Sequence, residues 1–213
     1  MLYKQTIKKS ALELLKIVMN DLSFHNFVLA GGTALALQIG HRISIALDLF
    51  TNLPFDENHL ADHLQRNYNF ELDFISSNTI KGEINGIQFD CIAHQYPWLE
   101  KQNKYGSIRL AGYLDIAAMK LNAISGDGTR LKDFIYIAFL STRIGLNQML
   151  QAYEQKYKSN PVIPLKAMSY FNNINFNEPV LMTEIKQLKW HFIEKRILEM
   201  QKFPDKVFEK IEM

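Results

Sequence analysis

The sequence predicts an α/β protein, in which a mixed sheet with flanking helices is followed by a helical half. Two observations support this prediction. Strand-like runs are found in the first half of the 213 residues, whereas apolar residues at helical spacing dominate from Leu114 onward. We therefore expect an α/β domain over residues 1–110 and a helical domain over residues 111–213.

Short helices and strands alternate in the first half. Residues 70–93 contain three strand-like runs, and Asn85-Gly86 between the last two is a strong signal for a two-residue hairpin. Pro54 and Asp56 open a helix that continues to about Tyr68. The elements expected here are helix 6–20, strand 27–30, helix 33–40, strand 45–50, helix 54–68 and strands 70–75, 79–84 and 87–93.

The second half is expected to contain helices only. Their ranges are 114–124, 130–143, 146–158, 162–172 and 180–201. The last of them has a stripe of apolar residues that predicts core packing (Leu181, Ile185, Leu188 and Phe192). It also carries basic residues that could contact nucleic-acid phosphates (Lys186, Lys189, Lys195 and Arg196). Interspersed glutamates favour a solvated face instead.

Composition narrows the class of protein. Apolar residues make up 47% and charged residues 22% of the chain, as in ordinary globular proteins. A net charge of +2 is too small for nucleic-acid binding through bulk electrostatics, so such binding would need a local patch. The single cysteine, Cys91, fits a reducing compartment. Without a signal-peptide core or an apolar run of membrane-spanning length, the sequence predicts a cytoplasmic protein that does not enter the membrane.

Gly31-Gly32 separates a short buried strand from a helix. Glycine has no Cβ, so the backbone can approach a ligand closely. The start of the following helix offers free N–H groups and a positive dipole end, and Thr33 adds a hydroxyl. Together these groups could hold a triphosphate, although a glycine pair by itself often makes only a tight turn.

Two aspartates are candidates for a metal site. Asp48 lies on the same face of its strand as Ala46, and the apolar Leu47 and Leu49 point to the opposite face. Asp90 sits between apolar neighbours of a later strand, where an acid is costly unless it is paired or bound to metal. Acids on adjacent strands that face the glycine turn would suit Mg²⁺. The alternative is that both acids lie on the solvated face of a sheet.

The segment GGTALALQIGHRISIALDLF resembles the AbiEii family of nucleotidyltransferase toxins. That family's pattern is a glycine pair, Thr, a helix, Arg-x-Ser and then Asp-x-Asp-Leu-Phe. A later segment, LDIAAMKLNAISGDGTRLKDF, also matches in its Asp-Ile-Ala-Ala-Met-Lys-Leu and Lys-Asp-Phe. The matched motifs lie within residues 27–140, and their combination is specific although each piece is not. The resemblance implies a nucleotidyltransferase-like fold.

For the first part of the site, the resemblance implies nucleotide binding at the glycine turn. Gly31, Gly32 and Thr33 would contact the phosphates of the nucleotide. Arg42 and Ser44 would shape the edge of the pocket.

For the reaction itself, the resemblance implies four further residues. Asp48 would ligate the metal and act in catalysis, and Asp90 would be the acid of the third strand and a second metal ligand. Lys120 would hold a phosphate and take part in catalysis. Asp133 would be the base or an orienting acid. Without the resemblance, Lys120 reads as a surface lysine and Asp133 as a carboxylate that favours the first turn of its helix.

Position 46 departs from the family pattern. Ala46 stands where the pattern has the first Asp of Asp-x-Asp, so one carboxylate ligand is missing and we expect impaired transfer. Tyr136 is a second departure, since many relatives have Asp there. Ala46 could be a natural variant that binds nucleotide without catalysis, or a substitution made to silence a toxic enzyme. The otherwise intact motifs favour the second explanation.

The resemblance implies a toxin of a toxin–antitoxin or phage-defence system. It would transfer a nucleoside monophosphate from an NTP, with Mg²⁺, to an acceptor such as the 3′ end of tRNA, and a cognate antitoxin protein would oppose it. One alternative is a transferase that acts on a protein or on a small molecule such as an aminoglycoside. Another is a catalytically inert nucleotide-binding or interaction protein, which Ala46 favours.

A zinc site at His59 and His63 is disfavoured because no third ligand is evident.

Overall fold

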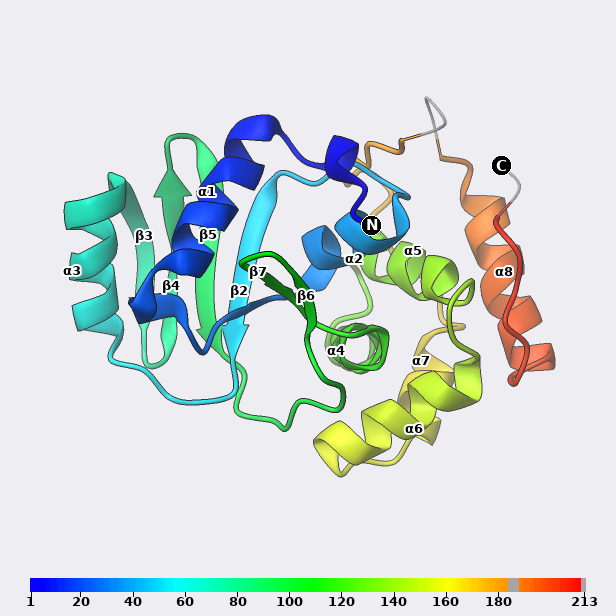
Figure 1. Ribbon diagram of the computed structural model, residues 1–213. Coiled ribbons are helices and arrows are strands. Elements are labelled where there is room, and N and C mark those ends of the chain that lie inside the picture. Colours follow the sequence, from blue (N-terminus) through cyan, green and yellow to red (C-terminus); the bar gives the residue numbers. More distant parts are fainter. Residues whose placement is uncertain (184–187, 212–213) are drawn as a thin grey trace. The chain divides into compact units, whose positions relative to one another are not determined.

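The computed structural model describes residues 1–183 and 188–211 (Figure 1). The chain divides into two compact units. One comprises residues 1–97 and 101–111, and the other comprises residues 98–100 and 112–213. The first unit contains a mixed sheet with helices and the second is helical, which confirms the predicted α/β class. Among the described residues, no helix has the length and apolar character needed to cross a membrane.

The sheet of the first unit has seven strands in the described part of the chain, in the order β3-β4-β5-β2-β1-β7-β6. The central pair β2 and β5 is parallel, as are β1 and β7, and the other neighbours are antiparallel. The strands are β1 (Val28–Leu29), β2 (Ala46–Thr51), β3 (Phe70–Ser76), β4 (Thr79–Ile84), β5 (Ile87–Ala93), β6 (Asn103–Tyr105) and β7 (Ile108–Leu110).

The β4–β5 hairpin forms where the sequence predicts it. Asn85 and Gly86 both have positive φ angles, 51° and 73°, as a tight two-residue hairpin turn requires. The β6–β7 hairpin was not predicted. Its strands have three residues each, which is too short for a recognisable alternation. Arg109 of β7 stabilises it by donating hydrogen bonds to the backbone carbonyls of Phe24 and Phe27.

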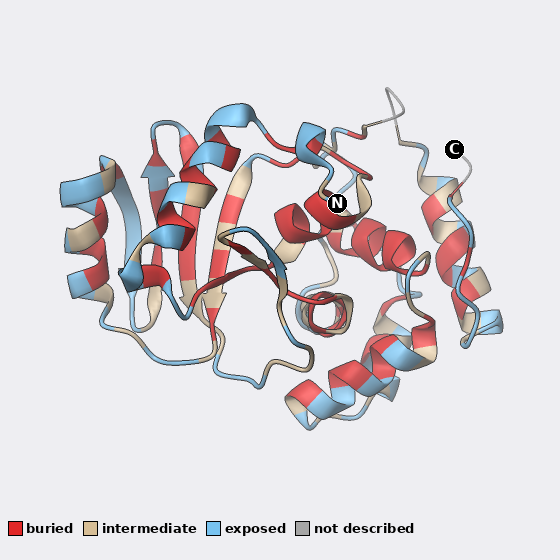
Figure 2. Ribbon diagram, in the orientation of Figure 1, coloured by how far each residue is buried: buried red, intermediate tan, exposed pale blue. Residues whose placement is uncertain are grey.

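Three α-helices belong to the first unit: α1 (Lys9–Asn20), α2 (Gly31–Ile39) and α3 (Glu57–Tyr68). Short 3₁₀ helices precede and follow α1, η1 (Lys4–Thr6) and η2 (Leu22–Phe24). The inner sides of α1 and α3 and alternate residues of the strands are buried (Figure 2). Leu47 and Phe89 of the central strands are fully buried, and the Phe24 ring packs edge-on against Phe89 at 6.2 Å. The core therefore lies between this face of the sheet and the segment around α1.

The second unit contains α4 (Tyr113–Gly126), α5 (Leu131–Leu140), α6 (Leu146–Tyr157), α7 (Val162–Ala167) and α8 (Trp190–Lys202). The first three lie close to their predicted ranges. The helix predicted over 162–172 ends early, in a stretch rich in asparagine. Asn175 bonds locally there, because its side chain accepts a hydrogen bond from the Asn177 N–H.

The start of the last helix was predicted wrongly. Helix α8 begins at Trp190 and not at residue 180, and Leu181, which was expected in the core, is 61% exposed. The buried stripe of α8 is shifted in register and contains Ile193, Ile197 and Met200. Ile185 and Lys186, with their neighbours at positions 184 and 187, lie outside the described residues.

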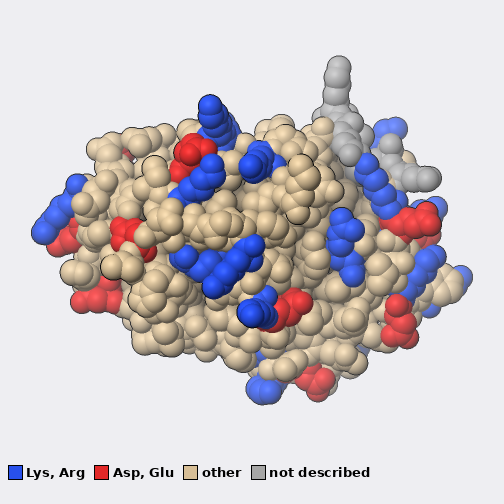
Figure 3. All heavy atoms as spheres, viewed as in Figure 1, with Lys and Arg blue, Asp and Glu red and all other residues tan. Residues whose placement is uncertain are grey.

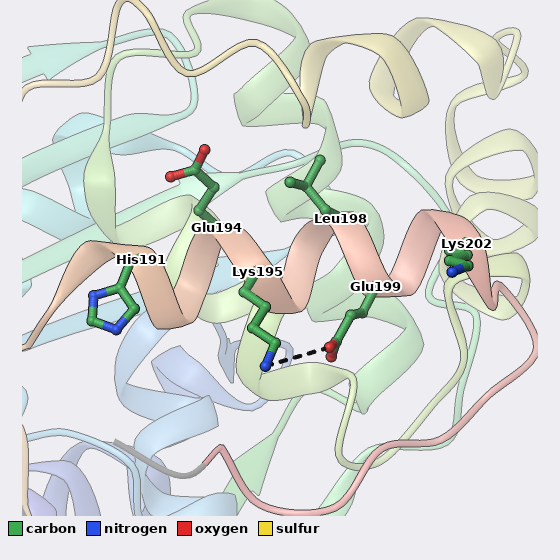
Figure 4. A pocket seen from close by; sticks show the side chains of 6 residues that line it. All are labelled: His191, Glu194, Lys195, Leu198, Glu199 and Lys202. Carbon is green, nitrogen blue, oxygen red and sulfur yellow. Dashed lines mark ion pairs between the residues drawn. The ribbon is translucent and has the colours of Figure 1, made fainter.

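The basic residues of α8 do not form one positive face. Arg196 is 9% exposed and donates a hydrogen bond to Ser141, so it belongs to the packing of the unit. On the outer side of the helix, lysines and glutamates alternate, and Lys195 Nζ lies 3.9 Å from Glu199 Oε1 (Figure 4). This mixture agrees with a solvated face more than with a phosphate-binding surface.

A buried ion pair fastens the segment 98–100 to the helices of the second unit. Lys156 Nζ lies 2.9 Å from Asp115 Oδ1, and their side chains are 1% and 0% exposed. The same carboxylate accepts hydrogen bonds from the backbone N–H groups of Leu99 and Glu100. The Lys156 ammonium also lies 4.9 Å from the centre of the Trp98 ring. Both charges are therefore fully compensated inside the unit.

We expect Lys156→Met to lower the free energy of unfolding by about 3–5 kcal/mol, because it leaves the Asp115 carboxylate buried without its cation. Urea unfolding followed by tryptophan fluorescence measures this, since both tryptophans of the chain, Trp98 and Trp190, belong to this unit. Lys195→Met removes an exposed pair and should cost at most about 0.5 kcal/mol. Equal losses for the two variants would contradict the importance of the buried pair.

Candidate active site

The two candidate metal ligands lie side by side on the central strands. β2 and β5 run parallel with Asp48 and Asp90 as direct partners in register. Neighbouring strands are about 4.8 Å apart, and directly paired residues share a face of the sheet. Along β2, burial alternates, with Leu47 and Leu49 fully buried and Asp48 half-buried. Asp48 therefore lies on the face predicted from the sequence.

The glycine turn lies directly over Asp48. Helix α2 begins at Gly31, two residues earlier than expected, and no side chain caps its first residue. Gly31 has a φ of 65°, and a Cβ there would lie 3.4 Å from Asp48 Oδ2. The N–H of Ala30 donates to the backbone carbonyl of Asp48. The positive φ favours glycine at this position, whereas the 3.4 Å distance by itself would be an ordinary contact for a Cβ.

Thr33, Ser44 and Arg42 are buried within the unit. Thr33 is 1% exposed, and its hydroxyl bonds to the Ser44 hydroxyl at 2.7 Å and donates to the backbone carbonyl of Ala46. Arg42 donates to the carbonyl of Ile43. The Thr33 hydroxyl therefore holds α2 against the start of β2, whereas the sequence analysis considered it as a group that could help to hold a triphosphate.

The environment of Asp90 disfavours its charged form. Its pKa is raised to about 6, first by burial and then by the neighbouring Asp48 carboxylate. Lys81 Nζ, 3.9 Å from Asp90 Oδ2, and the N–H of Gly82 act in the opposite direction. Among the described residues, Asp90 Oδ1 is buried without a hydrogen-bond partner.

These features suit a divalent cation. A cation between two carboxylates would remove their mutual repulsion and satisfy the buried Asp90 oxygen. Within residues 1–183 and 188–211, no group of three or more His, Cys, Asp or Glu is arranged to hold a metal. The protein thus offers two carboxylates, and Mg²⁺ commonly completes its shell with water and substrate phosphates. Ala46, two residues before Asp48 on the same face, contributes no ligand.

Sequence reasoning missed Lys81. The Asn85-Gly86 hairpin pairs Lys81 on β4 directly with Asp90 on β5. In a two-residue hairpin this pairing follows from counting outward from the turn. The signal was therefore available in the sequence, but its use required the partner strand to be considered.

Lys120 and Asp133 form a close pair inside the second unit. Lys120 Nζ lies 2.7 Å from Asp133 Oδ1, with side-chain exposures of 13% and 2%. The ammonium also lies 4.8 Å from the centre of the Tyr136 ring. Arg130 Nε is 4.0 Å from the other Asp133 oxygen. Lys120 is therefore a largely buried, oriented cation and not a lysine extended along the surface.

His63 has a structural environment of its own. Its Nε2 lies 2.7 Å from Asp21 Oδ2, which also accepts a hydrogen bond from the Tyr68 hydroxyl. His59, one helical turn earlier, is exposed. Among the described residues, neither histidine belongs to a group of three or more His, Cys, Asp or Glu side chains that could hold a metal.

Comparison with known proteins places these features in context. Residues 13–113 match the family model described as "Nucleotidyl transferase AbiEii toxin, Type IV TA system". A protein of Aquifex aeolicus, aq_aa25, described as uncharacterized, is 34% identical over 175 residues, which are 78% of this chain and 84% of that protein.

Two solved structures are similar in fold. A protein from H. pylori, described as a candidate nucleotidyltransferase, has a TM-score of 0.52 at 19% identity, over 92% of this chain and 94% of that chain. The antibiotic-resistance factor ANT(2'')-Ia has a TM-score of 0.51 at 12% identity, and the match covers 67% of this chain and 88% of that chain. At these identities the likeness concerns the fold alone, and it confirms the expected nucleotidyltransferase-like fold.

The raised pKa of Asp90 predicts a pH-dependent stability. Below about pH 4 the group is protonated in both states. Between about pH 4 and 6 the unfolded chain ionises first, so the free energy of unfolding falls as pH rises, by at most about 3 kcal/mol. Asp90→Asn removes this loss. Without divalent cations it should therefore be more stable than the parent at about pH 8 and equal to it near pH 3.5.

Urea unfolding at both pH values measures the difference. Asp62→Asn, which changes an exposed acid of α3 that does not contribute to the raised pKa of Asp90, is the matched control and should show no such divergence. If Asp90→Asn changed stability by the same amount at both pH values, the raised pKa of Asp90 would be contradicted.

Proposed function

This chain belongs to the AbiEii nucleotidyltransferase family through residues 13–113, and we propose that it is a toxin that transfers a nucleoside monophosphate from an NTP to an acceptor. The proposed acceptor is the 3′ end of tRNA, and the proposed cofactor is Mg²⁺. A cognate antitoxin protein would oppose the reaction. The observation that carries the proposal is the in-register pairing of Asp48 with Asp90 next to the Gly31 turn.

In the proposed reaction, residues of the first unit bind the phosphates and the cation. The backbone N–H groups at the start of α2 hold the phosphates, because a helix N-terminus attracts anions. Asp48 and Asp90 would hold a divalent cation, which would neutralise negative charge on phosphate oxygens. Since the Thr33 hydroxyl is used internally, Thr33 contributes through its backbone and through the position of α2.

We assign Lys120 as a phosphate-binding cation of the reaction and Asp133 as the residue that positions it. Asp133 is 2% exposed and bonded to the Lys120 ammonium at 2.7 Å, which suits orientation of a lysine better than removal of an acceptor proton. Arg42 and Ser44 contribute by supporting the strand that carries Asp48.

A second candidate is a catalytically inert nucleotide-binding protein, and Ala46 is the observation that favours it. Because Ala46 supplies no carboxylate, the metal has two protein ligands. Such a site is better suited to binding a nucleotide than to neutralising the negative charge of the transition state. Transfer to a protein or to a small molecule remains the other alternative, and the assay below includes these acceptors.

We expect Ala46→Asp to increase nucleotide transfer by on the order of 10²–10³, the usual effect of a group that stabilises charge in the transition state. The measurement is incorporation from each of the four labelled NTPs into total tRNA, into proteins and into aminoglycosides. Expression of the variant should also arrest growth.

Ala46→Asn is the matched control, since it adds a side chain of similar size without the charge, and it should remain near the parent activity. If the parent chain is fully active and the added acid changes nothing, impairment by Ala46 is wrong. If Ala46→Asp binds nucleotide but transfers none, the inert candidate is correct.

We expect Mg²⁺ to stabilise the parent chain through the acid pair. At a concentration of about ten times its dissociation constant, bound Mg²⁺ adds about 1.4 kcal/mol, or about 3–5 °C in Tm for a chain of this length. Asp48→Asn should abolish the shift, and Asp62→Asn, which changes an exposed acid of α3, should retain it. An equal shift in Asp48→Asn would show that Mg²⁺ binds elsewhere.

A further inference from the structure

A groove runs between the N-terminal segment, α1 and the tip of the β6–β7 hairpin. Its volume is about 580 Å³. Leu12 and Ile108, 6% and 3% exposed, lie deepest among its lining residues. Leu2 and Tyr105 also line it, and the Tyr105 side chain is 36% exposed. The groove thus has an apolar interior large enough for several side chains.

The segment that lines this groove is basic, although Lys16 is paired with the exposed Glu13 at 2.8 Å. Lys4 and Lys16 are among its lining residues, and residues 1–20 contain four lysines and a single acid, Glu13. In the space-filling view, blue basic side chains lie over α1 and the hairpin, with a red acidic patch among those over α1 (Figure 3). The pKa of Glu13 is lowered, first by its hydrogen bond to Lys16 and then by charges that include Lys9 and Lys4. Several lysines therefore act together at this surface.

The groove lies on the opposite side of the sheet from the acid pair. Phe24, just after α1, packs on Phe89. Phe89 precedes Asp90 on β5, so the two side chains point to opposite faces. The outer surface of α1 thus faces away from Asp48 and Asp90, and a molecule in the groove leaves that site open.

We propose that this groove binds an acidic peptide segment of a partner protein, which inserts apolar side chains over Leu12 and Ile108 and places carboxylates against Lys4 and Lys16. The lysine rim selects an anionic partner through charge complementarity. The floor formed by Leu12 and Ile108 is aliphatic and suits peptide side chains, whereas nucleobases bind mainly by stacking on aromatic rings and arginine. Tyr105 is the one aromatic ring among the lining residues, so the RNA probe below tests that alternative. A symmetric contact with a second copy would bring lysines against lysines. This inference does not depend on the transferase activity.

The test is fluorescence anisotropy with the full chain and a labelled decapeptide of alternating Asp/Glu pairs and single Leu or Phe residues. Comparison probes are the same peptide with Ser at every apolar position, and an oligouridine RNA of the same length. We expect the acidic apolar peptide to bind at least about tenfold more tightly than either. The double variant Lys4→Glu/Lys16→Glu should weaken its binding by at least about tenfold.

Lys158→Glu/Lys166→Glu makes the same charge change at exposed lysines of the second unit, and should bind like the parent. Tyr105→Ser changes the apolar wall without altering charge, and should also weaken binding. Thermal unfolding confirms that each variant is folded. The proposal is overturned if no peptide binds at about 1 mM, if the serine peptide or the RNA binds equally well, or if sedimentation shows a dimer that the Lys4→Glu/Lys16→Glu variant loses.

Discussion

The parallel, in-register pairing of β2 with β5 is the constraint on which the candidate site depends. It brings Asp48 and Asp90 together, although two carboxylates at this separation repel each other. The fold tolerates this because the alternation along β2 commits Leu47 and Leu49 to the core, which leaves Asp48 no other face. The raised pKa of Asp90 and its buried oxygen without a hydrogen-bond partner both indicate that the ionised carboxylate is unfavourable in this position. Unrelieved polar strain of this kind is typical of functional sites.

Two other buried polar groups, the Asp115 carboxylate and the Thr33 hydroxyl, are well compensated. Asp115 receives an ammonium and two backbone N–H groups inside the second unit. The Thr33 hydroxyl is bonded both to Ser44 and to a backbone carbonyl. These groups give shape and rigidity to each unit and leave nothing for a ligand to satisfy. The contrast between them and Asp90 distinguishes the parts of the chain that hold the fold from the part suited to bind a cation.

The contact between Thr33 and residue 46 also explains how the site keeps its shape with alanine there. Thr33 bonds to the main-chain carbonyl of Ala46, so the attachment of α2 to β2 does not depend on the side chain at that position. The glycine turn likewise contacts Asp48 and not Ala46. Architecture and ligand set are therefore separable, because a residue can be lost from the metal site without disturbing the backbone that carries it.

The sequence by itself determined the features that depend on neighbours along the chain. The alternation around Asp48, the Asn85-Gly86 hairpin, the glycine turn and most helices follow from local periodicity and turn chemistry, and the motif order from residue 27 to 140 indicated the family. Only the tertiary structure decided the short β6–β7 hairpin, the later start of α8, the internal use of the Thr33 hydroxyl and the pairing of Lys120 with Asp133. Each of these depends on residues distant in sequence, and the energy of burying or pairing a side chain is set by partners that no local pattern specifies.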